Sequence, residues 1–341
     1  MVSNRFLKIS VIIPTRDRPN DLADLLQTIL YQNYMPSEVI VVDDSPTCSA
    51  KSIWNLYVSS FRSKDCDLKY VLGDGDGLPA ARNLGVKVAK GDAILFLDDD
   101  TLLSDKNVIK VIAEFLEKNS DAMGVQPLII SLNIFTPISK RNLLACKLEN
   151  IIYKALMLTY NQDNTLSVRR SGASIFPNSL SKIVRAERLS GCCCCYRREI
   201  FRRFKFDTNL KRWGSKEDLD FSYRIYKKNP YSLYVIPCAK IIHKQTSKGR
   251  LQTKTTIHMF TIYWFYVFFK DIFDSSIVNL IAFMWALMGN LIVTTGGLIL
   301  KRKPKREWWT LIWLLNAYVV AFKNLRNILG SNLGFFNKNF G

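Results

Sequence analysis

The chain has 341 residues, enough for one large domain or two modest ones, and 48% of them are hydrophobic although 23% are charged. Its formal net charge of +19 favours anionic partners, either nucleic acid or the anionic face of a membrane. No helix-turn-helix, zinc-finger or RNA-binding signature accompanies the charge, which argues against nucleic acid and favours a membrane surface.

The N-terminal third alternates strand-like and helix-like segments. Apolar runs bounded by turn residues indicate strands, and apolar residues at three- and four-residue spacing indicate helices. The predicted strands are 8–15, 38–44, 69–72 and 93–97, and the predicted helices are 21–31, 49–60, 79–88 and 107–118. This alternation predicts an α/β fold with a mostly parallel, Rossmann-like sheet. The G-x-G-x-x-G fingerprint is absent after the first strand, so the pattern does not indicate NAD.

The middle of the chain is less regular. Its expected elements are a strand at 125–132, a helix at 142–158, a strand at 189–196, a short helix at 197–204 and a strand-like run at 234–237. The polar stretch 161–181 is expected to be a mobile loop. Cysteines 192–195 are adjacent and lack the C-x-x-C spacing of a zinc site, so we expect them to be buried small side chains.

Three carboxylates, Asp98, Asp99 and Asp100, follow the apolar strand 93–97. Like charges placed together repel one another unless a cation lies between them, and carboxyl ends of strands in α/β sheets are where ligands bind. Hard oxygen ligands suit Mg²⁺ or Mn²⁺, particularly one that also holds phosphates. The alternative is an acidic turn that caps the next helix.

Several motifs occur together in a fixed order. They are SVIIPT at 10–15, VVDDS at 41–45, PAARNLG at 79–85, FLDDD at 96–100, Gly191 before Arg197 and Arg198, and WGSKEDLD at 213–220. Across roughly residues 8 to 245 the chain resembles family 2 glycosyltransferases of the GT-A fold. A lone D-x-D pair would be a weak signal, whereas this series is specific.

The resemblance implies a pocket for a nucleotide-diphospho-sugar, with UDP or GDP as the nucleotide. It implies that Asp43 reads the base, that Pro14 and Thr15 line the same pocket, and that Arg82 approaches the nucleotide or its phosphates. Turn formation is the alternative for Asp43, and a solvated surface position is the alternative for Arg82.

The resemblance also implies a divalent metal, Mg²⁺ or Mn²⁺, that bridges the diphosphate. Asp98 is implied to contact the ribose or the metal, and Asp100 to coordinate the metal. His243 is implied to complete the metal site, although a lone histidine is often structural. Which of Asp98, Asp99 and Asp100 touches the metal is left open.

Glu217 and Asp218 match the acidic pair that carries the catalytic base of inverting members. A hydroxyl nucleophile must lose its proton to a carboxylate as it attacks the anomeric carbon. Asp218 is the expected base and Glu217 the orienting residue, with helix N-terminal stabilisation as the alternative. Asp220 and Arg224 are expected to form a structural pair. The Q-x-x-R-W signature of processive synthases is missing, so we expect transfer of a single sugar.

The composition changes near residue 250, which predicts a catalytic domain over 1–250 and a membrane region over 251–341. We expect a hairpin of two crossings, 257–273 and 277–300, and an interfacial helix at 308–322. The first residues carry no apolar signal-peptide core, and five basic residues lie in 301–306. These features predict a multi-pass cell-membrane protein with its catalytic domain on the cytosolic side.

The resulting hypothesis is a membrane-anchored, metal-dependent, inverting glycosyltransferase that uses a nucleotide-diphospho-sugar. Its expected acceptor is a polyprenyl-linked sugar or a growing cell-surface glycan. A polyprenyl phosphate is an alternative acceptor, and a nonenzymatic membrane scaffold with a decayed transferase domain is the alternative from another class. The joint presence of Asp43, Asp98, Asp100 and Asp218 argues against decay.

Overall fold

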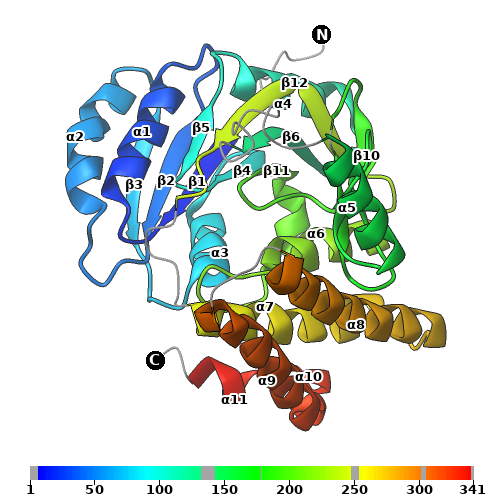
Figure 1. The fold of residues 1–341 in the computed structure, drawn as a ribbon. Helices are drawn as coiled ribbons and strands as arrows, with labels where there is room; N and C mark the ends of the chain where they lie inside the picture. The colour runs from blue at the N-terminus through cyan, green and yellow to red at the C-terminus, as the bar shows by residue number, and fades with distance from the viewer. Residues whose placement is uncertain (1–6, 132–142, 178, 247–252, 301–304, 339–341) are drawn as a thin grey trace. The chain divides into compact units, whose positions relative to one another are not determined.

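The computed structural model describes residues 7–131, 143–177, 179–246, 253–300 and 305–338 (Figure 1). The chain forms two compact units, each made from two separate stretches of sequence. Met1–Ile138 and Leu180–Gly249 form the first, which we call the sheet unit. Ser139–Ser179 and Arg250–Gly341 form the second, which we call the helical unit. The expected boundary near residue 250 coincides with one passage between the units, whereas the stretch before residue 180 groups with the C-terminal helices.

A nine-stranded sheet forms the core of the sheet unit, in the order β10-β12-β6-β11-β4-β1-β2-β3, with β5 beside β12. Strands β3, β2, β1 and β4 are parallel, whereas β11 is antiparallel to both β4 and β6. This confirms the predicted α/β fold with a mostly parallel sheet. The strands are β1 Ile9–Thr15, β2 Glu38–Asp43, β3 Asp67–Leu72, β4 Ala93–Leu97, β5 Thr101–Leu103, β6 Gly124–Ser131, β10 Val184–Ala186, β11 Cys193–Arg197 and β12 Leu233–His243.

Helices cover both faces of this sheet, because alternate residues of each buried strand point to opposite sides. Val11 and Ile13 of β1 join a hydrophobic core with Leu25 of one helix and Ile112 of another. Ile12 points the other way, against Gly85. The helices of the first face are α1 Pro19–Leu30, α2 Lys51–Arg62 and α4 Val108–Lys118, and those of the second include α3 Leu78–Val88 and α6 Glu217–Lys228.

The cysteine block forms the start of β11 and lies in the middle of the sheet. Cys192, Cys193, Cys194 and Cys195 are all buried, and none forms a disulfide. Their strand pairs with β4 on one side and β6 on the other. The expectation of buried small side chains is therefore confirmed.

The helical unit contains a small sheet that the sequence did not indicate. The stretch expected to be a mobile loop forms three short strands, β7 Tyr160–Asn161, β8 Ser167–Val168 and β9 Ser174–Phe176. The indole N–H of Trp264 donates to the carbonyl of Ser171 (2.9 Å) and fixes this sheet to a C-terminal helix. The mobile-loop prediction was therefore wrong over these strands, because the polar stretch acquires hydrogen-bond partners that are distant in sequence.

The helices of the helical unit are mostly C-terminal, and its first helix precedes the small sheet. They are α5 Leu143–Ala155, α7 Thr253–Val267, the π-helical η4 Phe268–Ile272, α8 Ile277–Leu300, the 3₁₀ turn η5 Lys305–Trp308, α9 Trp309–Lys323, α10 Leu325–Leu329 and α11 Gly334–Asn337. In the sheet unit, the short helix predicted at 197–204 is present as the 3₁₀ helix η3 Arg198–Arg202.

Among the described residues, α8 is the one helix long and apolar enough to cross a membrane by length and composition. The other expected crossing, 257–273, falls on α7 and η4, whose side chains are largely buried. Ile262, Tyr263 and Phe265 are fully buried, and α7 packs along α9. The two-crossing hairpin expected from composition therefore has one candidate helix in this part of the chain.

Candidate active site

The acidic loop after β4 is tied to β11 by its backbone. The amide N–H of Asp98 donates to the carbonyl of Cys192 (3.0 Å), and the hydroxyl of Thr101 donates to the same carbonyl (3.1 Å). The amide of Thr101 closes the turn on the carbonyl of Asp98 (3.1 Å). Because β1 and β4 are adjacent and parallel, this loop lies at a carboxyl edge where α/β proteins bind ligands.

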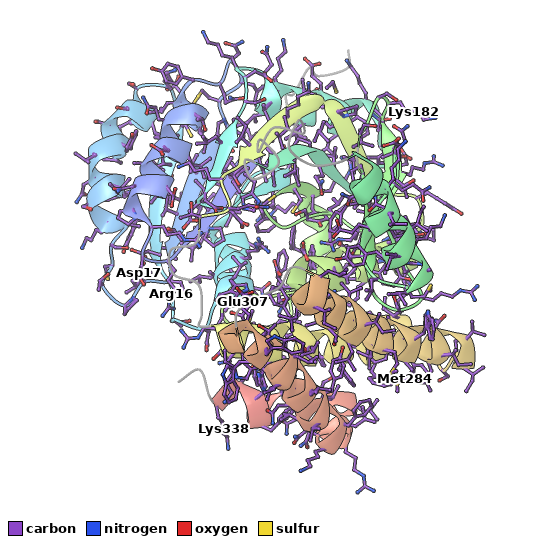
Figure 2. The ribbon with its side chains drawn as sticks, viewed as in Figure 1. Arg16, Asp17, Lys182, Met284, Glu307 and Lys338 are labelled. Carbon is purple, nitrogen blue, oxygen red and sulfur yellow. The ribbon has the colours of Figure 1, made fainter. Side chains whose placement is uncertain are left out.

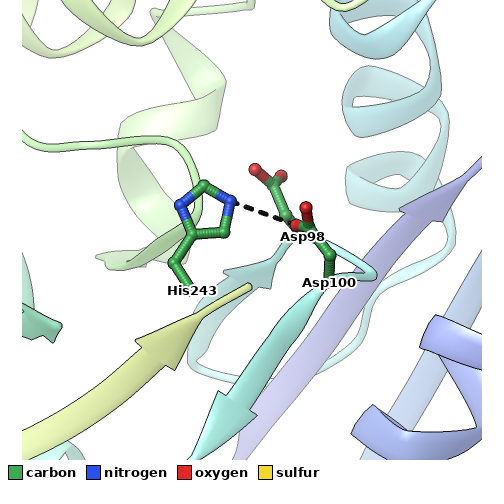
Figure 3. Close-up of side chains that lie close together, drawn as sticks. All are labelled: Asp98, Asp100 and His243. Carbon is green, nitrogen blue, oxygen red and sulfur yellow. Dashed lines mark hydrogen bonds and ion pairs between the residues drawn. The ribbon is translucent and has the colours of Figure 1, made fainter. Parts of the chain in front are cut away.

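Two of the three loop carboxylates converge on the end of β12. One ligand atom from each of Asp98, Asp100 and His243 lies within 4.8 Å of the others. Figure 3 shows the Nε2 of His243 beside the Oδ1 of Asp100, at 3.1 Å. The other oxygen of Asp100 accepts the amide N–H of Thr246 (2.9 Å). The three residues implied as metal ligands thus lie together in the structure.

Asp100 and His243 stabilise each other's charge. Burial is the largest single influence, and by itself it raises the pKa of Asp100 and lowers that of His243, but the hydrogen bond between them and the neighbouring charged and polar groups together outweigh it in both cases. The pKa of Asp100 is lowered, and the pKa of His243 is raised to about 11. These directions favour a carboxylate at Asp100 and an imidazolium at His243.

Asp99 shares Arg18 with Asp100, whose Oδ2 lies 3.5 Å from the guanidinium, but otherwise it has different partners from its two neighbours. It accepts hydrogen bonds from the hydroxyl of Thr15 (2.8 Å) and from the guanidinium of Arg18 (3.1 Å), and it is 4% exposed. Burial raises the pKa of Asp99 to about 7 despite the nearby Arg18. The geometry thus separates Asp98 and Asp100, which face His243, from Asp99, which holds the end of β1.

Arg82 connects Asp98 of the acidic loop to the acidic pair of α6. Helix α3 begins at Leu78 with Pro79 in its first turn, where the missing N–H costs no helical hydrogen bond. This start places Arg82, which is 1% exposed, between Asp98 (2.9 Å) and Glu217 (2.5 Å). The alternative of a solvated surface residue is wrong. The implied contact with donor phosphates remains a prediction, because both terminal nitrogens already bind protein oxygens.

Gly191 makes this arrangement possible. The Nη2 of Arg82 donates to the carbonyl of Gly191 (2.9 Å). A Cβ at Gly191 would lie 2.7 Å from Nη2 of Arg82 and 2.9 Å from Oε1 of Glu217. The position therefore has no room for a side chain, which gives the glycine of this motif a physical role.

The acidic pair begins α6, where carboxylates are favoured by the helix dipole. Glu217 is 5% exposed, and burial followed by repulsion from Asp218 raises the pKa of Glu217 to about 8 despite the ion pair with Arg82. Asp218 is less buried and accepts hydrogen bonds from Arg188 (2.5 Å) and from the amide of Gly191 (3.2 Å). Sequence reasoning missed Arg188, because no motif contains it and its partner lies 30 positions away.

Asp220 and Arg224 form the expected structural pair. The guanidinium of Arg224 donates to the carboxylate of Asp220 at 2.6 Å, one turn apart on α6. The aromatic ring of Phe221 lies between them in sequence and stacks on Phe206, which also lies under Arg82. This pair therefore stabilises the helix that carries the acidic pair.

Asp43 sits at the end of β2 with a fully buried side chain. Its carboxylate accepts the amide N–H groups of Ser45 (3.0 Å) and Ala50 (2.9 Å) and the hydroxyl of Tyr70 (2.9 Å). These contacts are those of the turn-forming alternative. Asp44 accepts the amide N–H groups of the next glycine-rich loop. Both oxygens of Asp43 are therefore occupied by its own unit, and base reading by this residue stays a prediction.

The other implied pocket residues lie on β1. Pro14 is opposite Val42 of β2 in the parallel register, and Thr15 is opposite Asp43. Pro14, Thr15 and Asp43 therefore share one carboxyl edge of the sheet with the acidic loop.

The donor set fits a divalent cation. Two carboxylates and one imidazole are ligands that Mn²⁺ and Mg²⁺ accept, and three protein ligands leave positions for water or diphosphate oxygens. A cation between these groups would relieve the repulsion between the two carboxylates.

Taken together, a mostly parallel α/β sheet with a D-x-D loop and a carboxylate pair defines a GT-A-type glycosyltransferase fold. The sequence profile of glycosyl transferase family 2 matches residues 10–205. The chain belongs to glycosyl transferase family 2, as the motifs predicted.

Relatives of known sequence align with a part of this chain. An uncharacterized glycosyltransferase of Rickettsia felis is 34% identical over 113 residues, which are 33% of this chain and 18% of the relative. A poly(ribitol-phosphate) beta-glucosyltransferase of Bacillus spizizenii is 31% identical over 118 residues, which are 34% of this chain and 18% of the relative. The chain thus spans about a fifth of the length of these relatives.

A solved structure extends the likeness to nearly the whole chain. The mannosyltransferase from Pyrobaculum calidifontis, determined in complex with GDP-Man and Mn²⁺, superposes with a TM-score of 0.58 at 17% identity. The match covers 94% of this chain and 88% of that chain. At this identity the likeness establishes the fold.

Proposed function

We propose that this protein is an inverting, metal-dependent glycosyltransferase that moves one sugar from a nucleotide-diphospho-sugar to a membrane-associated acceptor. The observation that carries the proposal is that one buried arginine contacts two separate clusters of acidic residues. Asp98, Asp100 and His243 form the metal side, Glu217 and Asp218 form the acceptor side, and Arg82 contacts both.

On the donor side, Asp98, Asp100 and His243 would hold the cation, Mg²⁺ or Mn²⁺. A bound divalent ion supplies Lewis-acid stabilisation of the departing nucleoside diphosphate. The fold relative from Pyrobaculum calidifontis was determined with GDP-Man and Mn²⁺, which supports a UDP- or GDP-sugar donor. Asp43 supports the nucleotide end by holding the loop after β2 through Ser45 and Ala50.

On the acceptor side, Asp218 is the better placed of the two α6 carboxylates to act as base. Its side chain is 20% exposed, compared with 7% for that of Glu217, which is occupied by Arg82. The acceptor hydroxyl would give its proton to Asp218 as its oxygen attacks the anomeric carbon, and the bond to the diphosphate breaks on the opposite face. Glu217 and Arg188 orient the base, and direct displacement inverts the anomeric configuration.

Two indirect observations support the proposed acceptor. The helical unit carries the apolar helix α8, which suits an acceptor presented at a bilayer, such as a polyprenyl-linked sugar or a cell-surface glycan. The Bacillus spizizenii relative is named for a poly(ribitol-phosphate) acceptor, which supports a glycan of this kind. Because nucleotide sugars are made in the cytosol, we propose that the sheet unit lies on the cytosolic side of the membrane.

The base assignment is tested by Asp218→Asn, which keeps the shape of the side chain but removes its basicity. We expect transfer to fall by at least about 100-fold, the usual contribution of a general base, while donor binding is retained. Asp76→Asn, at an exposed ion pair with Lys211, is the matched control and should transfer normally. Unchanged transfer by Asp218→Asn would refute the assignment.

The metal assignment is tested by Asp100→Ala, measured as donor binding by calorimetry with and without Mn²⁺. We expect the variant to lose the metal-supported part of donor affinity, because one carboxylate ligand and the partner of His243 disappear together. Metal-supported donor affinity equal to that of the wild type would contradict the assignment.

A further inference from the structure

Helix α8 presents two different faces along its first four turns. Ala282, Phe283 and Ala286 are buried inside the helical unit, where Phe283 stacks on Phe268. The opposite side is apolar and exposed, at positions three and four residues apart as helical geometry requires. Its members are Ile277 (67% exposed), Ile281 (63%), Met284 (42%), Trp285 (49%), Met288 (54%) and Ile292 (52%). Figure 2 shows Met284 on this outer side of the helix.

The end of α5 rests against the middle of α8. The indole N–H of Trp285 donates to the carbonyl of Ala155 (2.9 Å). A Cβ at Gly289 would lie 2.7 Å from Cβ of Leu156, so the two backbones approach closely there. Gly289 is near the centre of the 24-residue helix. In a membrane, residues 155 and 156 would therefore lie at about the same depth as the middle of α8.

That end of α5 carries charge and exposed polar backbone. The guanidinium of Arg169 donates to the carbonyls of Leu158 (2.8 Å), Lys154 (2.8 Å) and Tyr153 (3.2 Å), and the side chain of Lys154 is exposed. If α8, which is about 36 Å long, crossed a hydrocarbon core of about 30 Å, these groups would lie near the centre of that core. Intramembrane Lys and Arg are rare and costly, and irregular backbone is not found facing lipid.

We propose that α8 lies in the plane of the membrane surface, with its apolar stripe in the lipid and its opposite face on the protein, instead of crossing the bilayer. The helical unit is then a monotopic membrane-binding module. In this arrangement Arg169 and Lys154 lie at the depth of the interface, where charged groups reach water, and the contacts of Trp285 and Gly289 are kept. It replaces the two-crossing hairpin expected from composition.

Two further helices of the same unit present apolar side chains to the outside. On α5 they are Leu148 (57% exposed), Ile151 (63%) and Ile152 (44%), at helical spacing and flanked by Lys147 and Lys154. On α9 they are Trp309 (53%), Ile312 (50%), Leu315 (45%), Val319 (49%) and Phe322 (45%). An amphipathic helix with basic flanks and a Trp-bearing apolar side is the pattern that binds at a lipid interface.

The positive charge of the chain indicates that these apolar surfaces bind an anionic bilayer. The chain carries a formal net charge of +19, and five basic residues at 301–306 directly follow α8. Anionic lipid headgroups attract such basic segments, whereas a second copy of the chain would bring an equal positive charge against them. The inference rests on the membrane association proposed above, but not on the transferase chemistry.

The experiment measures the depth of single probes along α8 in the full chain. Single cysteines replace Ile281, Met288 and Ile299 in turn, in a background where Cys48, Cys146 and Cys238 are serine and the buried Cys66 and block 192–195 are retained. A fluorophore on each is quenched by lipids brominated at different acyl positions, in vesicles of phosphatidylcholine and phosphatidylglycerol. We expect all three probes to report the same shallow depth, about 5–10 Å into the headgroup and acyl boundary.

A quenching maximum deep in the bilayer at position 288, with shallow signals at 281 and 299, would overturn the proposal in favour of a crossing helix. Absence of vesicle binding would also overturn it. As a second measurement, the double variant Ile281→Glu/Met288→Glu should reduce vesicle binding at least tenfold, whereas Leu56→Glu, at an exposed leucine of α2, should not. Sugar transfer to a water-soluble acceptor, assayed separately, shows whether the transferase function stands when membrane binding fails.

Discussion

Gly191 is the residue at which the two halves of the candidate site meet most closely. We expect Gly191→Ala to destabilise the protein by about 1–3 kcal/mol, because the new methyl group would overlap the Arg82 guanidinium and the Glu217 carboxylate. Transfer activity should fall with it, since those two side chains must move apart. Urea unfolding and initial rates measure both effects.

Gly296→Ala is the control for this substitution. A Cβ at Gly296 meets nothing within 4 Å among the described residues, so we expect no loss of stability, a gain of up to about 1 kcal/mol from helix propensity, and normal activity. Equal stability of the Gly191 and Gly296 variants would show that the packing around Arg82 adapts without cost.

Glu217 makes the stability of the sheet unit depend on pH. Its folded pKa of about 8 lies above its ordinary value of 4.5, so the folded state holds a proton that the unfolded state releases between these values. The free energy of unfolding should therefore decrease as the pH rises from about 5 to about 8, by roughly 3–4 kcal/mol.

The variant Glu217→Gln isolates this contribution. At each pH, the free energy of unfolding of the variant is subtracted from that of the wild type. This difference should decrease as the pH rises. A difference that is constant between pH 5 and pH 9 would mean that Arg82 keeps the carboxyl of Glu217 ionised throughout.

At the residue scale, motif position predicted which side chains gather but not how they are used. The metal-side residues Asp98, Asp100 and His243 come from sites 143 positions apart and do meet. The hydrogen bonds that the buried Asp43 accepts from Ser45, Ala50 and Tyr70 could not be predicted. They depend on the path that the chain follows after β2. Arg188 was missed for the same reason.

At the scale of single elements, β11 shows how an unusual sequence can have an ordinary role. Three of the four adjacent cysteines, Cys193 to Cys195, lie in this strand because they are small, apolar and shielded between β4 and β6. Burial raises the pKa of the thiols of Cys193, Cys194 and Cys195. Their conversion to reactive thiolates is therefore suppressed in the folded protein.

This suppression gives a direct labelling prediction. Iodoacetamide under native conditions should modify the exposed Cys238 and leave residues 192–195 unmodified, and all should react after denaturation. Peptide mass spectrometry measures the modified sites. Native modification of the block at the rate of Cys238 would show that β11 opens to solvent.

Long elements with a clear period were predicted within a few residues, as for β4 and α4. The short strands β7, β8 and β9 have two or three residues each and too few positions to show a period. Their stability comes from contacts such as that between Trp264 and Ser171, and from Arg169, which binds the carbonyls at the end of α5. Such contacts join residues that are far apart in the sequence, so the local hydrophobic pattern does not predict them.

For the whole molecule, the positive charge predicts salt-dependent membrane binding. Cosedimentation with phosphatidylglycerol-containing vesicles should weaken when salt is raised from about 0.05 M to about 0.5 M, because screening shortens the range of attraction. Part of the binding should persist, since burial of apolar side chains does not depend on screening. Complete loss at high salt would mean that charge alone attaches the protein.

The division of each unit into two stretches of sequence has a consequence for biosynthesis. The carbonyl of Ser171 bonds to an indole 93 positions later, and that of Ala155 bonds to one 130 positions later. At translation rates of about 5–20 residues per second, these partners emerge on the order of ten seconds after the groups that they bind. During that interval the ribosome produces β10, β11 and β12, and β11 must insert between strands made earlier. Completion of the catalytic sheet therefore precedes completion of the helical unit, while the apolar side of α5 is already outside the ribosome and free to meet lipid.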